Sequence, residues 1–298
     1  MSDQAQPREI GAKPSLKDRT ALWLLKLAKF RQARLRTATP VDNQQFYAKF
    51  FQKKDVESFD RDIRMRVRRE TITACFGRLV APGAGVLDVG CGLGDVLHGL
   101  PKSYRLHGMD FARENVDASR ALLGQGADIR QGSIYEIPFD TASMDACLCL
   151  EVLEHIEDDA KAVREIARVL RPGGVLVASV PYTFYWPEYL PLIGHYRHYT
   201  RESFGRLLEN AGLRVREHLP NFPRWHQEYT RRYALLRAVA ETLGRLWCRR
   251  GVYSFKWPFS RECAVARLER RMQPTLDRDR LLPYAQLPTS TFIVAEKP

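Results

Sequence analysis

The sequence predicts an open α/β fold in which helices cover both faces of a mostly parallel sheet. From residue 85 onward, short apolar runs alternate with amphipathic helical stretches, the order that parallel strands with crossover helices require. A glycine-rich turn, VLDVGCGLGD at residues 86–95, follows the first apolar run. Ligands of open α/β sheets bind at turns of this kind, so we expect a ligand site there.

The individual elements follow from the apolar pattern. The expected strands are Gly85–Gly90, Tyr104–Asp110, Ala127–Gly132, Met144–Leu150, Gly174–Pro181, 213–219 and 290–298. Helices are expected over 113–123, over 158–170 with the turn sequence RPGG as its end, and over 201–211 between a Thr200 cap and Gly212. These elements give a seven-stranded, mostly parallel, doubly wound sheet.

Charge divides the chain into segments. Residues 1–80 carry a net charge of +9, residues 81–219 carry −5 and residues 220–290 carry +8. About 70 residues separate the last two expected strands, far more than a usual connection of ~4 to 6 residues, and they contain amphipathic, arginine-rich stretches. We therefore expect a basic N-terminal helical cap (1–80), a core (81–219), a basic helical insertion (220–289) and a final core strand (290–298).

Composition excludes several classes of protein. An apolar content of 45% is enough for a sizeable core. We find no apolar run of the ~18 to 20 residues that span a bilayer, and the N-terminus lacks the apolar centre of a secretion signal. The six cysteines form no Cys-x-x-Cys pair, and Cys147 and Cys149 are expected to fill a buried strand. A cytoplasmic protein is expected.

The glycine-rich turn favours a ligand without phosphates. Glycine at positions 90, 92 and 94 allows a tight turn and lets a ligand lie against the main chain. The pyrophosphate-binding fingerprint also needs a glycine at its sixth position, where this chain has Asp95. A carboxylate there would repel a pyrophosphate but tolerate a ligand with an ammonium group, which disfavours a nicotinamide-dependent dehydrogenase.

The second expected strand ends in an acid that suits a ribose. Asp110 lies twenty residues after Gly90, where a carboxylate can accept hydrogen bonds from both ribose hydroxyls. The turn and the acid together indicate a nucleoside without phosphates, and S-adenosylmethionine is the common cofactor of that description.

Four motifs in order then identify a family. The chain resembles the class I S-adenosylmethionine-dependent methyltransferases in VLDVGCGLG, GMDF, IPFDTASMDACLCLEVLEHI and VLRPGG. The resemblance covers residues 85–219 and the final strand, and it implies the Rossmann-like fold of that family.

The resemblance also implies a cofactor site. It assigns Asp88, Gly90, Gly92 and Gly94 to the methionine part, Asp110 to the ribose, Phe111, Ser133 and Ile134 to the adenine, and Leu150 and Glu151 to a cover over the cofactor. Ser133 departs from the family, which usually has an aspartate at or near this place. A hydroxyl can still accept a hydrogen bond there.

Histidines are the candidates for catalysis. His155, after the fourth strand, is expected to face the site of methyl transfer, where a neutral imidazole can remove a proton from a hydroxyl nucleophile. The aromatic segment 181–203 follows the fifth strand on the ligand side, and similar methyltransferases have a GHYRHYT-like approach near the acceptor. This segment adds His195 as the second candidate, together with Arg197, His198 and Tyr199. Each of these side chains could instead only pack against its own loop or form hydrogen bonds within it.

No carboxylate or cysteine completes a recognisable metal-binding set with the three histidines, so no metal is expected.

We therefore expect methylation of an oxygen, or else of a nitrogen or carbon, on a small molecule or a lipid- or glycan-linked acceptor. The basic flanks, in which Trp and Leu alternate with Lys and Arg, suit peripheral contact with an anionic inner-membrane surface, or helices that pack on the core. Two alternatives stay open. One is a structured-RNA methyltransferase that uses the flanks on phosphates, and the other is a non-catalytic protein that uses the fold as a cofactor sensor or scaffold.

Overall fold

The computed structural model describes residues 63–181, 194–219 and 292–298, which belong to one compact unit. The predicted helical cap, except for its last helix, lies outside the described residues. So do the whole of the predicted insertion at 220–289 and residues 182–193 of the aromatic segment. None of the described helices is long and apolar enough to cross a bilayer.

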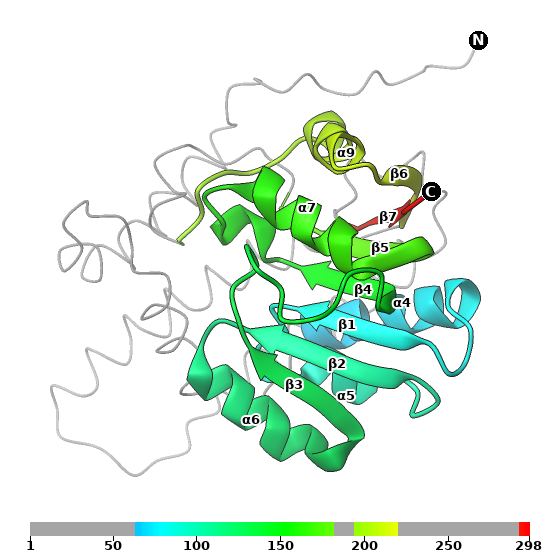
Figure 1. Ribbon diagram of the computed structural model, residues 1–298, viewed down its shortest axis with the longest axis vertical. Coiled ribbons are helices and arrows are strands. Elements are labelled where there is room, and N and C mark those ends of the chain that lie inside the picture. The colour runs from blue at the N-terminus through cyan, green and yellow to red at the C-terminus, as the bar shows by residue number, and fades with distance from the viewer. Residues whose placement is uncertain (1–62, 182–193, 220–291) are drawn as a thin grey trace, which may run out of the picture. The chain divides into compact units, whose positions relative to one another are not determined.

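A seven-stranded sheet forms the centre of this unit (Figure 1). Its strands are β1 (Gly85–Val89), β2 (Arg105–Asp110), β3 (Ala127–Gln131), β4 (Met144–Leu150), β5 (Leu170–Ser179), β6 (Arg214–Leu219) and β7 (Phe292–Glu296). They lie in the order β3-β2-β1-β4-β5-β7-β6, and β7 runs antiparallel to both of its neighbours. The predicted seven-stranded, mostly parallel sheet is thus confirmed.

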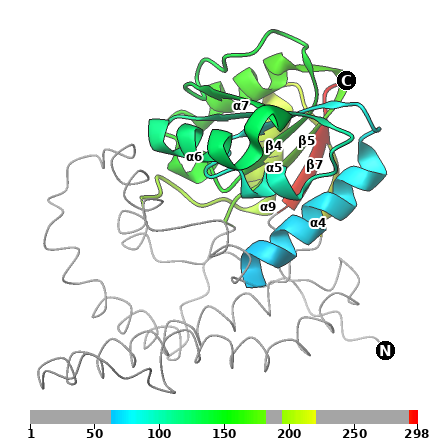
Figure 2. The same cartoon turned by 90° about the horizontal axis from the view of Figure 1, so that it is seen from below.

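Helices cover both faces of the sheet, because apolar side chains on the strands alternate between the two faces. Leu87 and Val89 of β1 pack in one apolar cluster, whereas Val86 packs in the other. The first cluster contains α7 (Asp159–Val169) and α9 (Arg201–Asn210). The second contains α4 (Ile63–Leu79), α5 (Asp95–Gly99) and α6 (Arg113–Leu123), and Figure 2 shows α4 beside the strands.

The two short 3-10 helices are η1 (Gly124–Gly126) and η2 (Leu153–His155). The helix caps agree with the sequence. Asp158 accepts a hydrogen bond from the backbone of Lys161, and Thr200 forms a reciprocal capping box with Ser203.

The fifth strand begins earlier than predicted. The sequence indicated a helix through residue 170, then a turn, and a strand from Gly174, but β5 starts at Leu170, which pairs with Met144. The RPGG turn forms an irregularity inside the strand pairing, since Ala146 already pairs with Val175. Gly173 takes the positive φ of +76° that this geometry requires.

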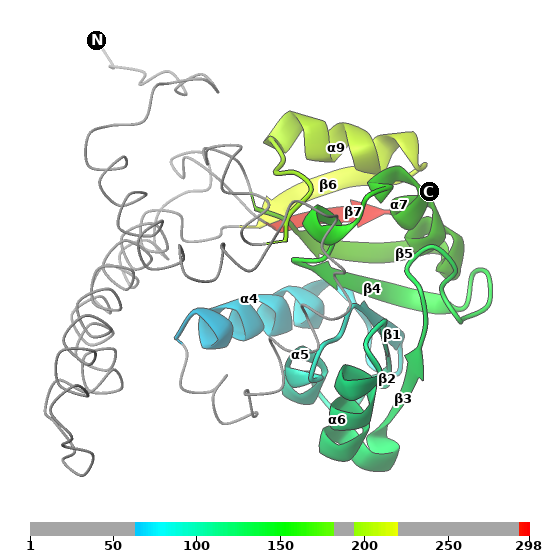
Figure 3. The ribbon, with the colours of Figure 1, turned by 90° about the vertical axis from the view of Figure 1, so that its left-hand side faces the viewer.

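Strand β4 lies at the centre of the sheet, between β1 and β5 (Figure 3). Cys147 and Cys149 on it are fully buried, as expected for strand-filling cysteines. Because β1, β2, β3 and β4 are parallel, their carboxyl ends meet at one edge of the sheet, and this edge carries the predicted site.

Candidate functional site

The glycine loop, residues 90–95, connects β1 to α5 and depends on glycine at three positions. Gly90, Gly92 and Gly94 have φ values of +78°, +54° and +80°. A Cβ atom on Gly90 would come within 2.6 Å of Val152, and one on Gly94 within 2.5 Å of Ser119. The loop therefore needs glycine both for its backbone conformation and for the space around it.

Backbone hydrogen bonds tie this loop to the end of β2. The N–H groups of Gly90 and Cys91 donate to the carbonyl oxygen of Met109 at 2.8 and 2.9 Å. The N–H of Gly92 donates to Oδ2 of Asp110 at 3.0 Å. The predicted ribose acid thus also fixes the shape of the glycine loop.

Asp110 is held by three protein donors. Besides Gly92, its Oδ1 accepts hydrogen bonds from the N–H of Ala112 at 2.9 Å and from the side chain of Asn115 at 3.1 Å. Asn115 lies on α6 and is buried, so its hydrogen bond fixes the carboxylate of Asp110 against that helix. Phe111 follows with 53% of its surface exposed, which leaves its ring available to a planar ligand.

Three buried or nearly buried acids surround the loop. Burial raises the pKa of Asp88 to about 7, against the opposing charge of Arg68. The pKa values of Asp95 and Asp110 are also raised, in each case mainly by burial. These acidic groups, opposed by Arg68 at Asp88 and by Arg68 and Arg69 at Asp95, favour a ligand with positive charge and disfavour one with phosphates.

Arg68 is a site residue that the sequence did not single out. It lies on α4, and its guanidinium donates a hydrogen bond to the carbonyl oxygen of Leu150 at 3.0 Å. In the sequence, one basic residue inside a basic helical segment does not stand out as a candidate site residue. Only the packing of α4 on the sheet places its charge near Asp88 and Asp95.

The two residues predicted beside the adenine after β3, Ser133 and Ile134, also make contacts within the protein. The hydroxyl of Ser133 accepts a hydrogen bond from the N–H of Tyr135 at 3.2 Å, which closes a tight turn after β3. Ile134 is buried and packs in the α7-side core with Met109. Ser133 thus keeps a hydroxyl at the edge, while the side chain of Ile134 contributes to the core.

The predicted cover after β4 has a strained backbone. Glu151 has a φ of +58°, in a region that non-glycine residues rarely adopt. Its N–H donates to the carbonyl oxygen of Ser179, whose hydroxyl in turn donates to Oε1 of Glu151, both at 2.9 Å. These two bonds hold Glu151 in place beside Leu150, at the carboxyl end of β4. Such strain is concentrated at functional sites.

The structure brings the predicted histidines together. Nδ1 of His155 lies 2.9 Å from the carbonyl oxygen of Gly194. The rings of His155 and His195 make an edge-to-face contact, with their centroids 4.4 Å apart. Nδ1 of His195 lies 2.7 Å from Nε2 of His198. Burial lowers the pKa of His155 to about 4, so its ring is neutral at neutral pH.

Arg197 and Tyr199 bind their own loop to the core. The hydroxyl of Tyr199 donates to the carboxylate of Asp159 at 2.8 Å, and the guanidinium of Arg197 donates to the carbonyl oxygen of Ile156 at 3.0 Å. Tyr199 is buried. Of the predicted acceptor residues, these two therefore position the segment that carries His195 and His198.

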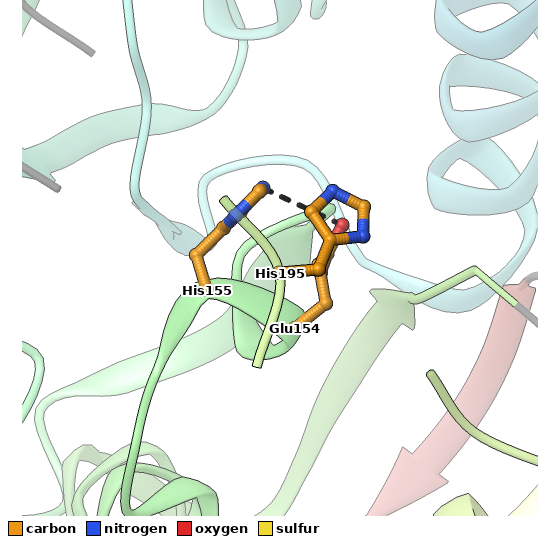
Figure 4. A group of neighbouring side chains, drawn as sticks. All are labelled: Glu154, His155 and His195. Carbon is orange, nitrogen blue, oxygen red and sulfur yellow. Dashed lines mark ion pairs between the residues drawn. The ribbon is translucent and has the colours of Figure 1, made fainter. Parts of the chain in front are cut away.

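A carboxylate stands beside these histidines, contrary to the sequence-based expectation. Oε1 of Glu154 lies 3.8 Å from Nε2 of His155. One ligand atom from each of Glu154, His155 and His195 lies within 4.8 Å of the others (Figure 4). The sequence shows Glu154 next to His155 but cannot show that His195 lies beside both.

Comparisons with known proteins agree with this geometry. The sequence profile of the family described as "Methyltransferase domain" matches residues 87–178. A probable S-adenosylmethionine-dependent methyltransferase of Mycolicibacterium smegmatis is 37% identical over 146 residues, which are 47% of this chain and 56% of that protein. A ubiquinone biosynthesis O-methyltransferase of Xanthomonas axonopodis pv. citri is 32% identical over 170 residues, 51% of this chain and 70% of that protein.

The chain belongs to the class I S-adenosylmethionine-dependent methyltransferases. It spans about half the length of several of the curated relatives that it matches. Among solved structures, a putative sarcosine dimethylglycine methyltransferase from Galdieria sulphuraria aligns with a TM-score of 0.55 at 18% identity, over 86% of this chain and 98% of that one. This last similarity concerns the fold alone.

The described residues fit the cofactor of these methyltransferases. S-Adenosylmethionine carries a sulfonium and an ammonium group and no phosphate, which matches a glycine loop bordered by Asp88, Asp95 and Asp110. The three glycines hold this loop in a tight turn with positive φ values, and Asp110 fixes the N–H of Gly92. Asp95 at the start of α5 does not suit the pyrophosphate of a dinucleotide.

We predict that Gly90→Ala weakens cofactor binding and stability more than Gly83→Ala does. Both glycines have a positive φ, near +80°, but a Cβ on Gly83 would meet no atom within 4 Å. Both variants should lose about 1 to 2 kcal/mol from the strained φ. Gly90→Ala should lose about 1 to 3 kcal/mol more through its contact with Val152. Urea unfolding and calorimetric titration with S-adenosylmethionine measure these effects, and equal losses in the two variants would contradict the steric role.

We predict that Asp88→Asn stabilises the ligand-free protein increasingly as the pH rises. The unfolded carboxyl ionises near the ordinary pKa of 3.8, whereas burial holds the folded carboxyl protonated up to about pH 7. The wild type therefore loses stability between these values, and asparagine does not. The gain should be small near pH 4 and reach on the order of 4 kcal/mol above pH 7.

Urea unfolding of both proteins from pH 4 to pH 8 checks this prediction. Asp128→Asn is the matched control, because a hydrogen bond from Arg130 lowers the pKa of Asp128. That variant should gain no stability at any of these pH values. A gain from Asp88→Asn that is equally large at pH 4 and pH 8 would show that burial of its charge is not the cause.

Proposed function

We propose that the chain transfers the methyl group of S-adenosylmethionine to an oxygen atom of a small-molecule or a lipid- or glycan-linked acceptor. The observation that carries this proposal is the position of the histidine group, which consists of His155, His195 and His198. His155 follows β4 directly after the predicted cofactor cover at Leu150 and Glu151, and His195 lies against it. A proton acceptor thus stands at the same sheet edge as the glycine loop.

The cofactor, when bound, supplies a methyl group on a positively charged sulfur, which is an efficient leaving group. The chain's own residues have to bind the cofactor and the acceptor, orient them toward each other and exclude water. The glycine loop and Asp110 would hold the nucleoside and the methionine part. Arg68 lies among the acids of the site and would pair with the carboxylate of the methionine part.

Proton removal falls to the histidines. The carbonyl oxygen of Gly194 can only accept a hydrogen bond, so the proton on the His155 ring belongs on Nδ1 and the lone pair on Nε2. Nε2 is therefore the atom that would face the acceptor hydroxyl. The contact between His195 and His198 offers an onward path for the proton.

Relatives that are named as O-methyltransferases support oxygen as the methylated atom. The Xanthomonas protein is one of them, and an O-methyltransferase of Aspergillus sclerotiorum, 32% identical over 124 residues, is another. Neutral imidazoles beside the site also suit a hydroxyl acceptor, whose proton must leave as the new bond forms.

We predict that His155→Gln lowers the methylation rate by ~100-fold or more and leaves the affinity for S-adenosylmethionine within about twofold of the wild type. The transfer of tritiated methyl to phenolic and catecholic acceptors measures the rate, and calorimetry measures the affinity. His98→Gln is the control, because His98 is exposed on α5 and is not one of the predicted site residues. A His155→Gln enzyme with the wild-type rate would contradict the role of this histidine.

The same assay distinguishes the alternative functions. Methyl transfer to structured RNA but to none of the small acceptors would overturn the proposed acceptor class. Cofactor binding without transfer to any acceptor would instead indicate a sensor or scaffold.

A further inference from the structure

We propose that Glu154, His155 and His195 bind a divalent transition-metal ion and that this ion holds the acceptor oxygen. The inference rests on the methyl transfer to oxygen proposed above. It replaces direct proton removal by His155 with activation of the oxygen by the ion, because the lone pair on Nε2 of His155 cannot serve both. It assigns a shared function to two predicted catalytic histidines and a carboxylate that the sequence analysis left unused.

The three side chains converge although they come from two separate segments. Glu154 and His155 belong to η2, directly after β4, and His195 follows about 40 residues later, in the segment that leads to α9. A ligand atom from each lies within 4.8 Å of the others. In Figure 4 a dashed line joins the His155 ring to the Glu154 carboxylate, which overlaps the ring of His195 in this view.

This spacing is close to that of a metal site. Metal–ligand bonds of ~2.0 to 2.1 Å in tetrahedral geometry place ligand atoms ~3.3 to 3.4 Å apart. Nε2 of His155 and Oε1 of Glu154 are 3.8 Å apart. Small rotations of the side chains are enough to bring the three atoms to bonding distance of one ion.

The surroundings orient both rings as metal ligands. A ligating histidine usually donates its other ring N–H to a backbone carbonyl or another acceptor, which fixes the tautomer. Nδ1 of His155 makes this contact with the carbonyl oxygen of Gly194 at 2.9 Å. Nδ1 of His195 lies 2.7 Å from Nε2 of His198, and donation from His195 across this contact leaves the lone pair on its own Nε2.

Glu154 supplies an independent observation. Its surface is only 1% exposed, and its Oε2 accepts no hydrogen bond within the part of the chain that the structure describes. A buried carboxylate oxygen without a donor is costly, and buried carboxylates are normally paired or bound to a cation. The oxygen lies beside two imidazoles, the other atoms that such a cation would need.

The ligand types define the class of ion. Two imidazole nitrogens and one carboxylate oxygen form the ligand set of several catalytic zinc and non-haem iron sites. Mg²⁺ and Ca²⁺ prefer oxygen ligands throughout. We therefore expect Zn²⁺, or another divalent ion of the first transition row, to bind in preference to Mg²⁺.

Three protein ligands leave positions on the ion for the acceptor. A hydroxyl oxygen bound to the ion becomes more acidic, as water on zinc does. This oxygen releases its proton to solvent and then forms a bond to the methyl carbon as the carbon–sulfur bond of the sulfonium breaks. The electron pair of that bond stays on sulfur, which leaves as a neutral thioether.

Metal titration tests the proposal without reference to activity. The full-length protein is treated with EDTA and desalted, and it is then titrated with Zn²⁺ in a calorimeter and with Co²⁺ while its visible absorption is recorded. We expect one ion per chain. Glu154→Gln and His195→Gln should each weaken binding by at least ~100-fold, because loss of a ligand exceeds the 10- to 100-fold cost of losing an outer-shell partner.

Controls keep the result interpretable. His98→Gln should bind Zn²⁺ as the wild type does, and Mg²⁺ should bind the wild type far more weakly than Zn²⁺. Thermal unfolding identifies any variant that fails to fold, and His195→Gln decides the question if the more buried Glu154→Gln does not fold. A wild type that binds neither Zn²⁺ nor Co²⁺, or an ion that the ligand variants bind as tightly as the wild type, would overturn the proposal.

Activity then separates this inference from the proposed function. We expect methyl transfer to fall at least ~100-fold after EDTA treatment and to return with Zn²⁺ or Co²⁺. Transfer that continues undiminished without metal overturns the role of the ion and leaves the methyltransferase function in place. Metal binding at these three residues without any methyl transfer confirms the ion site and overturns the methyltransferase function.

Discussion

Asp88, Asp95 and Asp110 are brought together at the carboxyl edge of the sheet, where the charge of Arg68 acts on Asp88 and Asp95. Each of these carboxyls has a raised pKa, mainly because of burial, so the protein holds them at a cost to its own stability. Packing of α4 is what brings Arg68 to this edge. A ligand with positive charge relieves the cost, and this requirement connects the fold to the cofactor.

The glycine loop and the histidine group lie at the ends of the neighbouring strands β1 and β4, and each has a different role. The loop after β1 is held in a tight turn by its three glycines and by the hydrogen bond from Gly92 to Asp110. The segment after β4 places His155 and Glu154 beside His195. Because parallel strands end at the same edge, both groups meet without any long-range rearrangement.

The sequence predicted most of the core and part of the site, for physical reasons that differ between residues. Strand β4 was predicted with its observed bounds because a continuous apolar run marks a central buried strand. The start of β5 was missed because the pairing of Leu170 with Met144 depends on tertiary contacts that override the turn signal of RPGG. Arg68 and the approach of His195 to Glu154 were missed because only folding brings these residues to the site.

Calorimetric titration of the purified protein with S-adenosylmethionine, repeated on Asp110→Ala, tests the central claim most directly. The acid-lined glycine loop should bind the cofactor with micromolar affinity. This binding should be lost in the variant, because Asp110 fixes the loop and ends β2, where a carboxylate can accept hydrogen bonds from a ribose. No binding by a folded wild type, or equal binding by the two proteins, would contradict the claim that this edge of the sheet is a cofactor site.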